Sequence, residues 1–509
     1  MLTKSALSLQ QKIKEKKLYD YQQKDLDQIF KYFDESNDDV NLLYQLPTGG
    51  GKTVVFSEIA RRFIRERNKK VVVLTHRIEL GAQTSRMLNG FGVKNKIINS
   101  NVKELKDQDE YKCFVAMVET LNNRLQEEKV EINNIGLVII DEAHYNSFRK
   151  LFKYFENSII LGVTATPLSS NVKLPMKDNY KKLIIGESIQ SLIDKNFLAK
   201  AEVYNRDVSL KTLKLGVGGD YTVKSSEELY GNFSMLSKLV SAYEDIAKGT
   251  KTLIFNNGIN TSIYVYETFK KAGYNIRHLD NKNNATERKE ILKWFSETPG
   301  AILTSVSILT TGFDEPTVET IILNRATKSL TLYFQMIGRG SRVLPNKDKF
   351  TVLDMGNNVA RFGMWDAPID WKEIFLFPDF YLENIKNDEE IERNFVYEMP
   401  DSLKEQFSNS ASLEFDVKAE YKKVFSAGKK SKLVLEKSIN QHAQICFENS
   451  EDVFDARILA KQLKDEIEYR VRLYSYCIMN NTKNYKEWLA EDYERKLRLK
   501  ISQKFSDKL

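Results

Sequence analysis

Two short stretches of this chain carry residue types that handle phosphate groups. Residues 46–53 read Leu-Pro-Thr-Gly-Gly-Gly-Lys-Thr, and residues 141–144 read Asp-Glu-Ala-His. A glycine-rich loop presents backbone N–H groups to phosphate oxygens, its lysine reaches the β- and γ-phosphates, and its threonine hydroxyl holds Mg²⁺. An acidic pair supplies a further contact to Mg²⁺ and a carboxylate that positions the attacking water. Together the two stretches predict a site that hydrolyses a nucleoside triphosphate.

Both stretches follow apolar runs that read as buried parallel strands. Residues 41–46 lead into the glycine-rich loop, and residues 137–140 lead into Asp141. Strands of a parallel sheet are covered on both faces, so they are continuously apolar, and ligands bind at their carboxyl ends. Such runs alternate with amphipathic stretches from about residue 40 to residue 166, which predicts a doubly wound α/β domain.

A second series of apolar runs follows, at residues 252–255, 275–279, 301–306, 320–323 and 350–353. It predicts another α/β domain, but one without a glycine-rich phosphate loop. Two such domains in tandem, only the first with the loop, indicate a site at the interface between them.

Two further segments differ in character from these series. The glycine-rich residues 216–219 lie between the two series and indicate a turn, a hairpin or a flexible linker. After about residue 373 the chain becomes rich in Lys, Glu and Asn, and residues 452–480 and 488–504 read as helices. The C-terminal part is therefore expected to be mainly helical.

Composition places the chain among ordinary globular proteins. Its 509 residues are too many for one core, and 42% are hydrophobic and 29% charged. No apolar run approaches the roughly 18 residues that span a membrane, and the first residues lack a secretory signal. The scattered Cys113, Cys446 and Cys477 form neither a disulfide framework nor a zinc motif. We expect a cytoplasmic protein, or one in the host cytoplasm if phage-encoded. Its net charge of +7 is compatible with nucleic acid.

Further motifs extend the two phosphate-handling stretches into a series. Residues 18–22 read Leu-Tyr-Asp-Tyr-Gln, 164–167 read Thr-Ala-Thr-Pro, 310–314 read Thr-Thr-Gly-Phe-Asp, and 335–342 read Gln-Met-Ile-Gly-Arg-Gly-Ser-Arg. In this order, over about residues 18–360, they resemble the motifs of superfamily 2 helicase-type motors of the DEAH kind. The resemblance implies two tandem RecA-like doubly wound parallel-sheet domains, at 1–198 and 199–372, and a mainly helical domain at 373–509.

The resemblance also implies that ATP and Mg²⁺ bind between the two RecA-like domains. Lys52 would hold the β- and γ-phosphates, Thr53 and Asp141 the Mg²⁺, and Glu142 the attacking water. Leu46 departs from the pattern, since Gly or Ala is usual there. The remaining contacts from the first domain would be Gln22 at adenine and, along the loop, Thr48, Gly49, Gly50 and Gly51.

The second domain would complete this site. Gln335 would orient the water or the γ-phosphate, and Arg339 and Arg342 would reach the γ-phosphate across the cleft. The three-residue spacing of the arginines on a helix would place both on one face. Asp314 would bond the ribose hydroxyl.

Other positions are expected to bind nucleic acid or to couple that binding to the nucleotide state of the ATP site. Thr164 and Thr166 are expected to bond Asp141 or Glu142 and so transmit the nucleotide state. Each of these short motifs also has an ordinary explanation, because such residues end strands and a single His is often a core residue. The full set is His76, Arg77, Thr120, His144, Thr164, Thr166, Asn256 and Thr311.

The predicted function is an ATP-dependent DNA helicase or translocase that unwinds or remodels duplex or branched DNA. DNA is favoured over RNA because the motif at 335–342 lacks the His-Arg start of DEAD-box RNA helicases and residue 164 is Thr rather than Ser. An RNA helicase, an ATP-switched nucleic-acid clamp or sensor, and a defence-system motor subunit without unwinding activity stay open.

Within the superfamily the chain is similar to RadD-like bacterial and phage helicases and to restriction-type motor subunits. Residues 218–221, Gly-Gly-Asp-Tyr, and residues 356–363, Gly-Asn-Asn-Val-Ala-Arg-Phe-Gly, look RadD-like. RadD-like proteins typically carry a four-Cys zinc element after the motor, and this chain lacks it. The C-terminal region either stacks bases on its aromatic residues, such as Trp488, or forms an ordinary accessory core that is open to a protein partner.

Overall fold

The computed structural model describes residues 17–35, 41–102, 105, 108–127, 130–171, 173–310, 312–394, 396–479 and 482–507. These residues fall into two compact units. The first comprises residues up to 206 together with 210–394, and the second comprises 207–209 together with 395–509. No helix in the described ranges is long and apolar enough to cross a membrane.

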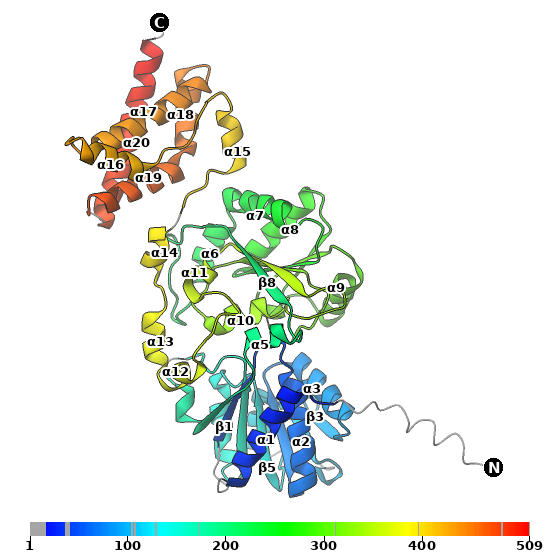
Figure 1. The fold of residues 1–509 in the computed structure, drawn as a ribbon. Coiled ribbons are helices and arrows are strands. Elements are labelled where there is room, and N and C mark those ends of the chain that lie inside the picture. Colours follow the sequence, from blue (N-terminus) through cyan, green and yellow to red (C-terminus); the bar gives the residue numbers. More distant parts are fainter. Residues whose placement is uncertain are drawn as a thin grey trace. The chain divides into compact units, whose positions relative to one another are not determined.

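The first α/β domain is built on a sheet of seven parallel strands in the order β3-β4-β2-β5-β6-β1-β7 (Figure 1). Val71 and Val73 pack into the core on one face, and Val72 and Leu74 pack into the core on the other. Burial on both faces explains the continuous apolar runs. The strands are β1 (Asn41–Gln45), β2 (Lys70–Thr75), β3 (Asn95–Ile98), β4 (Cys113–Met117), β5 (Ile135–Asp141), β6 (Ile159–Thr164) and β7 (Lys182–Ile185).

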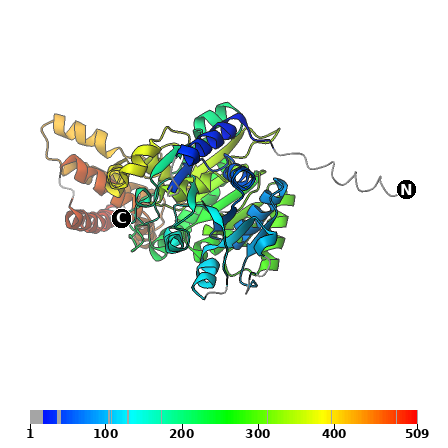
Figure 2. The ribbon, with the colours of Figure 1, turned by 90° about the horizontal axis from the view of Figure 1, so that it is seen from below.

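Helices cover both faces of this sheet, as the ribbon also shows from below (Figure 2). The most important is α2, which starts at Lys52 directly after Gly51 (φ 88°) and ends before Asn68 (φ 52°), two residue types that tolerate the left-handed conformation. The helices are α1 (Asp20–Glu35), α2 (Lys52–Arg67), α3 (Ile78–Gly90), α4 (Val118–Gln126) and α5 (Ile189–Asp194), with 3-10 turns η1 (Gln108–Glu110), η2 (Asn146–Tyr154) and η3 (Met176–Asp178).

The second α/β domain has six parallel strands in the order β10-β11-β9-β12-β13-β8. The chain enters this sheet at Lys200, and the predicted boundary at 198/199 stays a prediction. Its strands are β8 (Lys200–Asn205), β9 (Thr252–Asn256), β10 (Ile276–Leu279), β11 (Ile302–Ser305), β12 (Thr320–Asn324) and β13 (Lys349–Asp354). Its helices are α6 (Val223–Tyr230), α7 (Phe233–Ile246), α8 (Ile259–Lys271), α9 (Ala285–Glu297), η4 (Ser307–Leu309), α10 (Leu330–Ile337) and α11 (Asn358–Phe362).

The glycine-rich segment between the two sheets forms a small hairpin. Leu215 and Tyr221 form an antiparallel bridge, and the Gly216 N–H donates to the Asp220 carbonyl at 2.8 Å. Gly219 at the tip has φ 81°, a conformation that glycine adopts without strain. Of the three expectations for this segment, the hairpin is therefore correct.

After the second sheet, α12 (Trp371–Leu376), α13 (Pro378–Asn384) and α14 (Asp388–Asn394) remain in the first unit. Phe375 packs into the core of the first α/β domain, and Lys177 Nζ donates to the Leu376 carbonyl at 2.7 Å. This segment, residues 371–394, therefore runs from the second α/β domain back onto the first. The predicted boundary at 372/373 stays a prediction.

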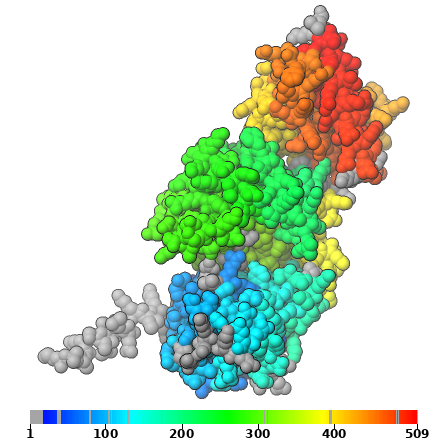
Figure 3. Space-filling model, turned by 180° about the vertical axis from the view of Figure 1, so that it is seen from behind, coloured from blue at the N-terminus to red at the C-terminus, as the bar shows by residue number. Residues whose placement is uncertain are grey.

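The second unit is helical and has its own core, which includes Val434, Ile467, Tyr493 and Ile501. Its orange and red residues gather in one compact body in Figure 3. Its helices are α15 (Asp401–Lys404), η5 (Glu405–Phe407), α16 (Val417–Ser426), α17 (Leu433–Glu448), α18 (Val453–Gln462), α19 (Lys464–Cys477) and α20 (Lys483–Ser506). The predicted class, two parallel-sheet α/β domains followed by a mainly helical region, is confirmed.

Candidate active site

The glycine-rich loop joins the carboxyl end of β1 to the N-terminus of α2. Gly49 and Gly51 have φ values of 91° and 88°. A Cβ on Gly51 would lie 2.5 Å from Gln22 Nε2, and one on Gly49 would lie 2.6 Å from Leu198 Cδ2. Only glycine fits both positions, and the loop carries the chain directly into the helix N-terminus, whose free N–H groups attract anions.

Lys52 stands at the first position of α2 and faces the acidic pair. Its Nζ atom donates to the Leu46 carbonyl over a long 3.4 Å. Desolvation lowers the pKa of this ammonium, while the nearby Glu142 and Asp141 oppose that shift. A partly buried cation with one weak hydrogen bond suits an anionic ligand.

The acidic pair occupies the carboxyl end of β5. Glu142 has φ 54°, which is unusual for a residue with a side chain and fixes the direction in which its carboxylate points. Burial and the Glu142 charge raise the pKa of Asp141. Burial would also raise the pKa of Glu142, but Lys52, His144 and Arg339 hold it below its usual value. Glu142 therefore stays ionised and can accept a hydrogen bond from water.

A chain of polar contacts leads from Glu142 to the second α/β domain. His144 Nδ1 lies 3.4 Å from Glu142 Oε2 and 3.2 Å from Thr164 Oγ1. The Thr164 hydroxyl donates to the Thr166 carbonyl at 2.9 Å, and Thr166 Oγ1 lies 2.7 Å from Thr331 Oγ1. The expectation that these hydroxyls bond Asp141 or Glu142 directly is wrong, because His144 lies between.

Arg342 brings the second α/β domain onto the phosphate loop. Its Nη1 donates to the Gly49 carbonyl at 2.9 Å, and its Nε donates to Asp314 Oδ1 at 2.8 Å. A Cβ on Gly338 would lie 2.6 Å from Thr48 Cγ2, so the two domains are in contact here. The site is thus shared between the two domains.

Arg339 has different partners and lies outside the predicted helix. Its Nη1 and Nη2 donate to the carbonyls of Phe313 and Thr310, at 2.5 and 2.7 Å. Helix α10 ends at Ile337, so Arg339 lies in a turn and Arg342 beyond it. The prediction that both arginines share a helix face is therefore wrong. Gly338 and Gly340, a residue type with low helix propensity, were the overlooked signal.

Three buried polar atoms around this site have no hydrogen-bond partner among the described residues: Glu142 Oε2, Gln335 Nε2 and Arg339 Nε. Leaving such an atom unpaired costs about 1–3 kcal/mol, so native proteins rarely do so without a ligand or water. One acceptor and two donors beside Lys52 match a water and phosphate oxygens. The residues present therefore fit a nucleoside triphosphate, and the predicted contacts of Thr53 and Asp141 with Mg²⁺ stay predictions.

The residues predicted to contact the adenosine moiety are engaged within the protein. Gln22 is 2% exposed, its Nε2 donates to the Gly50 carbonyl at 3.2 Å, and its Oε1 accepts from the Tyr19 N–H at 3.1 Å. Asp314 pairs with Arg342. Gln22 supports the phosphate loop, and the contacts to adenine and ribose stay predictions.

The residues predicted to bind nucleic acid differ in their contacts within the protein. Arg77 Nη1 donates to the Ile308 carbonyl at 2.9 Å and so links the two α/β domains. His76 packs against Tyr145 and Phe148, with ring centroids 4.4 and 4.2 Å away, and burial lowers its pKa to about 4. Thr120 lies on α4, and Thr311 lies outside the described residues.

Asn256 belongs to an internal network. It is 1% exposed, and its Nδ2 donates to Thr304 Oγ1 at 2.9 Å and to the Ser305 carbonyl at 3.2 Å. Its Oδ1 accepts from Asn324 Nδ2 at 2.8 Å. The amide is thus engaged within the protein, and the predicted contact with nucleic acid stays a prediction.

Sequence reasoning missed Thr331, the partner of Thr166. The signal was present, because Thr331 precedes Gln335 by four residues and therefore lies on the same face of α10. Nothing local to the sequence pointed across the cleft to Thr166.

Comparisons with known proteins agree with this arrangement. Residues 15–169 match the family model described as "Type III restriction enzyme, res subunit". Residues 231–343 match the model described as "Helicase conserved C-terminal domain". The two matches cover the two α/β domains and the motifs that meet between them.

Relatives and a solved structure extend the comparison. The chain is 28% identical to a "51.5 kDa protein" of Lactococcus phage (isolate 7-9), over 65% of this chain and 69% of the relative. It is 29% identical to the "Putative ATP-dependent helicase IRC3" of Saccharomyces cerevisiae, over 69% of this chain and 53% of the relative, so it spans about half of that protein. The structure of "ATP-dependent Type ISP restriction-modification enzyme LlaBIII bound to DNA" shares its fold at a TM-score of 0.53 and 15% identity, over 96% of this chain and 43% of that one.

Both α/β domains are thus RecA-like, and the motifs, the shared site and the matched families agree. The chain belongs to the superfamily 2 helicase-type motors, the ATP-dependent nucleic-acid motors that occur among helicases and restriction-enzyme motor subunits.

Proposed function

We propose that this chain is an ATP-hydrolysing motor that translocates along DNA and unwinds or remodels duplex or branched DNA. The observation that carries the proposal is the contact of Arg342, from the second RecA-like domain, with the Gly49 carbonyl of the phosphate loop in the first. A site completed only when two domains meet converts hydrolysis into relative domain motion.

The proposed roles follow from the positions of the residues. Lys52 neutralises the β- and γ-phosphates, and Thr53 and Asp141 hold Mg²⁺. When bound, Mg²⁺ neutralises charge that develops on the phosphates. Glu142 orients the attacking water, because its carboxylate is ionised and buried and its Oε2 atom has no hydrogen-bond partner among the described residues. Gln335 offers its unpaired amide N–H to the water or the γ-phosphate.

In this proposal Arg342 and Arg339 have different functions. Arg342 reaches the phosphate loop and acts as the arginine finger, a group that is worth about 10³ to 10⁵ in rate. Arg339, held by the carbonyls of Thr310 and Phe313, fixes the loop that carries Asp314. The polar chain from Glu142 through His144 to Thr331 then couples domain closure to the water-orienting carboxylate.

DNA is proposed over RNA for two reasons. Motors of this family occur in restriction enzymes, and one solved structure that shares this fold is described as bound to DNA. The motif at 335–342 also lacks the His-Arg start of DEAD-box RNA helicases.

The test is ATP hydrolysis without nucleic acid and with single-stranded DNA, forked DNA and matched RNA, together with strand displacement from the fork. Lys52→Ala is the control, because it removes the phosphate-binding ammonium. We expect stimulation by DNA, strongest with the fork, and displacement that requires Lys52. Stimulation by RNA alone would refute the proposal that the substrate is DNA. Stimulation by DNA without strand displacement would indicate a clamp or a motor that does not unwind. A rate indifferent to every nucleic acid would refute the motor.

A further inference from the structure

Arg342 follows α10 on a segment that belongs to neither a helix nor a strand. Its side chain is 33% exposed, so packing alone does not fix where the guanidinium lies. The position of this group depends instead on how the backbone of the segment is held and on Asp314, which accepts from Arg342 Nε at 2.8 Å. The contact of Arg342 with the phosphate loop is thus built on an irregular segment that needs support from elsewhere in the chain.

Lys347 supplies that support from a tight turn. The N–H groups and carbonyls of Leu344 and Lys347 bond each other at 3.0 and 2.9 Å, which returns the chain to the segment of Arg342. Lys347 Nζ then donates to the carbonyls of Gly340 and Arg342, at 2.8 and 2.9 Å. Only 8% of Lys347 is exposed, so these bonds form in a low-dielectric environment, where they are stronger than in water.

The remaining bond of the ammonium reaches the loop that carries Asp314. Lys347 Nζ donates to the Pro316 carbonyl at 2.9 Å, two residues beyond Asp314. An ammonium has three N–H donors, and three carbonyls accept them, so every donor of Lys347 is used. One cation therefore joins the backbone of Arg342 to the loop whose carboxylate binds the Arg342 guanidinium.

The protonation of Lys347 decides how many of these bonds it can make. Burial lowers the pKa of Lys347 to about 8, against the carboxylates of Glu319 and Glu315 and in the same direction as the nearby Arg342 cation. Below that pH the ammonium supplies three donors, whereas the neutral amine has two donors for three carbonyls. The hold on the Arg342 segment therefore weakens as the pH rises through about 8.

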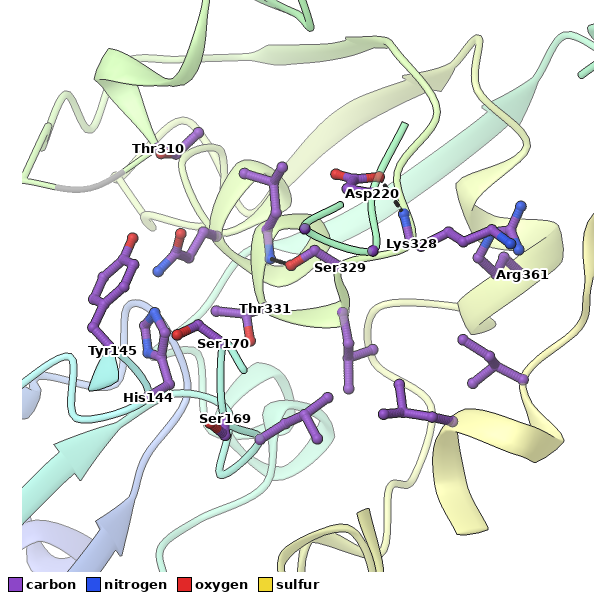
Figure 4. A pocket seen from close by; sticks show the side chains of 18 of the residues that line it. His144, Tyr145, Ser169, Ser170, Asp220, Thr310, Lys328, Ser329, Thr331 and Arg361 are labelled. Carbon is purple, nitrogen blue, oxygen red and sulfur yellow. Dashed lines mark hydrogen bonds between the residues drawn. The ribbon is translucent and has the colours of Figure 1, made fainter. Parts of the chain in front are cut away.

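Lys347 lies apart from the cavity that is shown in Figure 4. The described lining of that cavity includes His144, Thr331 and Gln335 but neither Lys347 nor Arg342. A substitution at Lys347 therefore leaves this lining unchanged, so its effect on ATP hydrolysis does not come from the cavity.

We propose that Lys347 is a positioning residue for Arg342. Its three bonds hold the backbone of residues 340–342 against the loop of Asp314, and this arrangement directs the Arg342 guanidinium to the Gly49 carbonyl of the phosphate loop. The inference rests on the proposed role of Arg342 as the arginine finger. Lys347 itself contacts neither ATP nor the attacking water, and it acts only through Arg342.

The first test is Lys347→Met, which removes the donors and keeps the length of the side chain. We expect kcat for ATP hydrolysis to fall by about 10²-fold with the KM for ATP nearly unchanged, because the finger is misplaced. Lys251→Met is the matched control. Lys251 is 5% exposed and faces the same two carboxylates, but it donates to the Ser296 carbonyl at 2.7 Å. Both variants should lose thermal stability, and Lys251→Met should keep kcat.

Arg342→Ala and the double variant show whether Lys347 acts through Arg342. Once Arg342 is absent, Lys347→Met should cause no further loss of kcat, because the group that it positions is gone. An equal loss in the Arg342→Ala background would overturn the proposal, and so would full activity of Lys347→Met beside a defective Arg342→Ala. If Arg342→Ala hydrolyses ATP normally, the arginine finger of the proposed function fails, and the role of Lys347 fails with it.

The pH profile of kcat is a readout that a purely structural lysine would not move. In the unchanged chain kcat should fall as the pH rises through about 8. Lys347→Arg, whose guanidinium stays charged, should move this fall to higher pH. A kcat that does not fall, or a fall at the same pH in Lys347→Arg, would overturn the proposal, since another group such as Lys52 would then set the profile. If Lys347→Met does not fold, this comparison decides.

Discussion

The two RecA-like domains share one architecture, but one strand-end carboxylate of each is bonded in a different way. In the first domain, Glu142 follows β5 and leaves its Oε2 atom buried without a hydrogen-bond partner among the described residues. In the second, Asp354 ends β13, and its carboxylate accepts from the N–H groups of Gly356 and Val359 and from Asn358 Nδ2, at 2.8 to 2.9 Å. Both carboxylates stand at the carboxyl end of a parallel strand, and the local hydrogen bonds decide their use.

The difference between these two carboxylates distinguishes a ligand-binding group from a structural one. A buried polar group that remains unpaired costs stability, so it persists where a ligand or a water completes it. A saturated group of the same type holds loops in place and has no capacity left for a ligand. The second domain therefore contributes to the proposed chemistry through Gln335 on α10 and Arg342 beyond it.

The largest expected effect is that of Arg342→Ala. Because Arg342 is the second domain's contact with the phosphate loop, we expect kcat for ATP hydrolysis to fall by about 10³-fold or more, with the KM for ATP nearly unchanged. Arg339→Ala should instead lower the thermal midpoint, because Arg339 is buried and bonded to two carbonyls. Steady-state kinetics and thermal unfolding of both variants check this division. Normal hydrolysis by Arg342→Ala would mean that the first domain acts alone.

A smaller effect is expected from Asn256→Ala, which probes the saturated strand ends. The substitution leaves partners on Thr304, Ser305 and Asn324 unpaired, so we expect a loss of about 1–3 kcal/mol in the free energy of unfolding. DNA affinity and its salt dependence should not change, since the amide is engaged within the protein. Denaturant unfolding and DNA titrations at several salt concentrations measure both quantities. Weaker DNA binding at unchanged stability would restore Asn256 as a nucleic-acid contact.

An effect of similar size, confined to a range of pH, concerns Asp25, a buried carboxyl of the first domain outside the ATP site. Burial raises its pKa to about 6, although the Tyr44 hydroxyl, which donates to it at 2.7 Å, opposes the shift. The folded chain thus keeps this proton up to about pH 6, whereas the unfolded chain releases it near pH 4. Stability contributed by the protonated form is present below pH 4 and is lost as the pH rises through 6.

Asp25→Asn removes this titration. We expect the variant to gain about 1–3 kcal/mol over the unchanged chain as the pH rises from 4 to 6.5, measured as the difference in thermal midpoints. An identical pH dependence for both chains would show that Asp25 is already ionised in the folded state.

Much of the fold and the ATP site could be predicted from the sequence because the signals are local. The apolar runs before Lys52 and Asp141 specify buried parallel strands, and chemistry at their carboxyl ends follows from the topology of such sheets. The phosphate loop needs its glycines for backbone reasons that act within a few residues. Lys52, Thr53, Asp141 and Glu142 therefore lie together as expected.

The hydrogen-bond partners of several predicted site residues could not be predicted from the sequence. The helix ends at Ile337, so Arg339 and Arg342 do not share a helix face and have different partners. Asn256 has the residue type and strand-end position of a ligand contact, yet Thr304 and Asn324 saturate it. Residue type gives the capacity to bond, and only packing selects the partner.

By itself the sequence determined the strands, the helix starts and the inventory of reactive groups, because each depends on a few neighbouring residues. Tertiary structure alone decided that Thr166 meets Thr331, 165 residues away, and that Arg342 reaches Gly49. It also decided that the segments at 218–220 and 361 line one pocket. Such contacts form only when two separately folded sheets face each other, so no local pattern contains them.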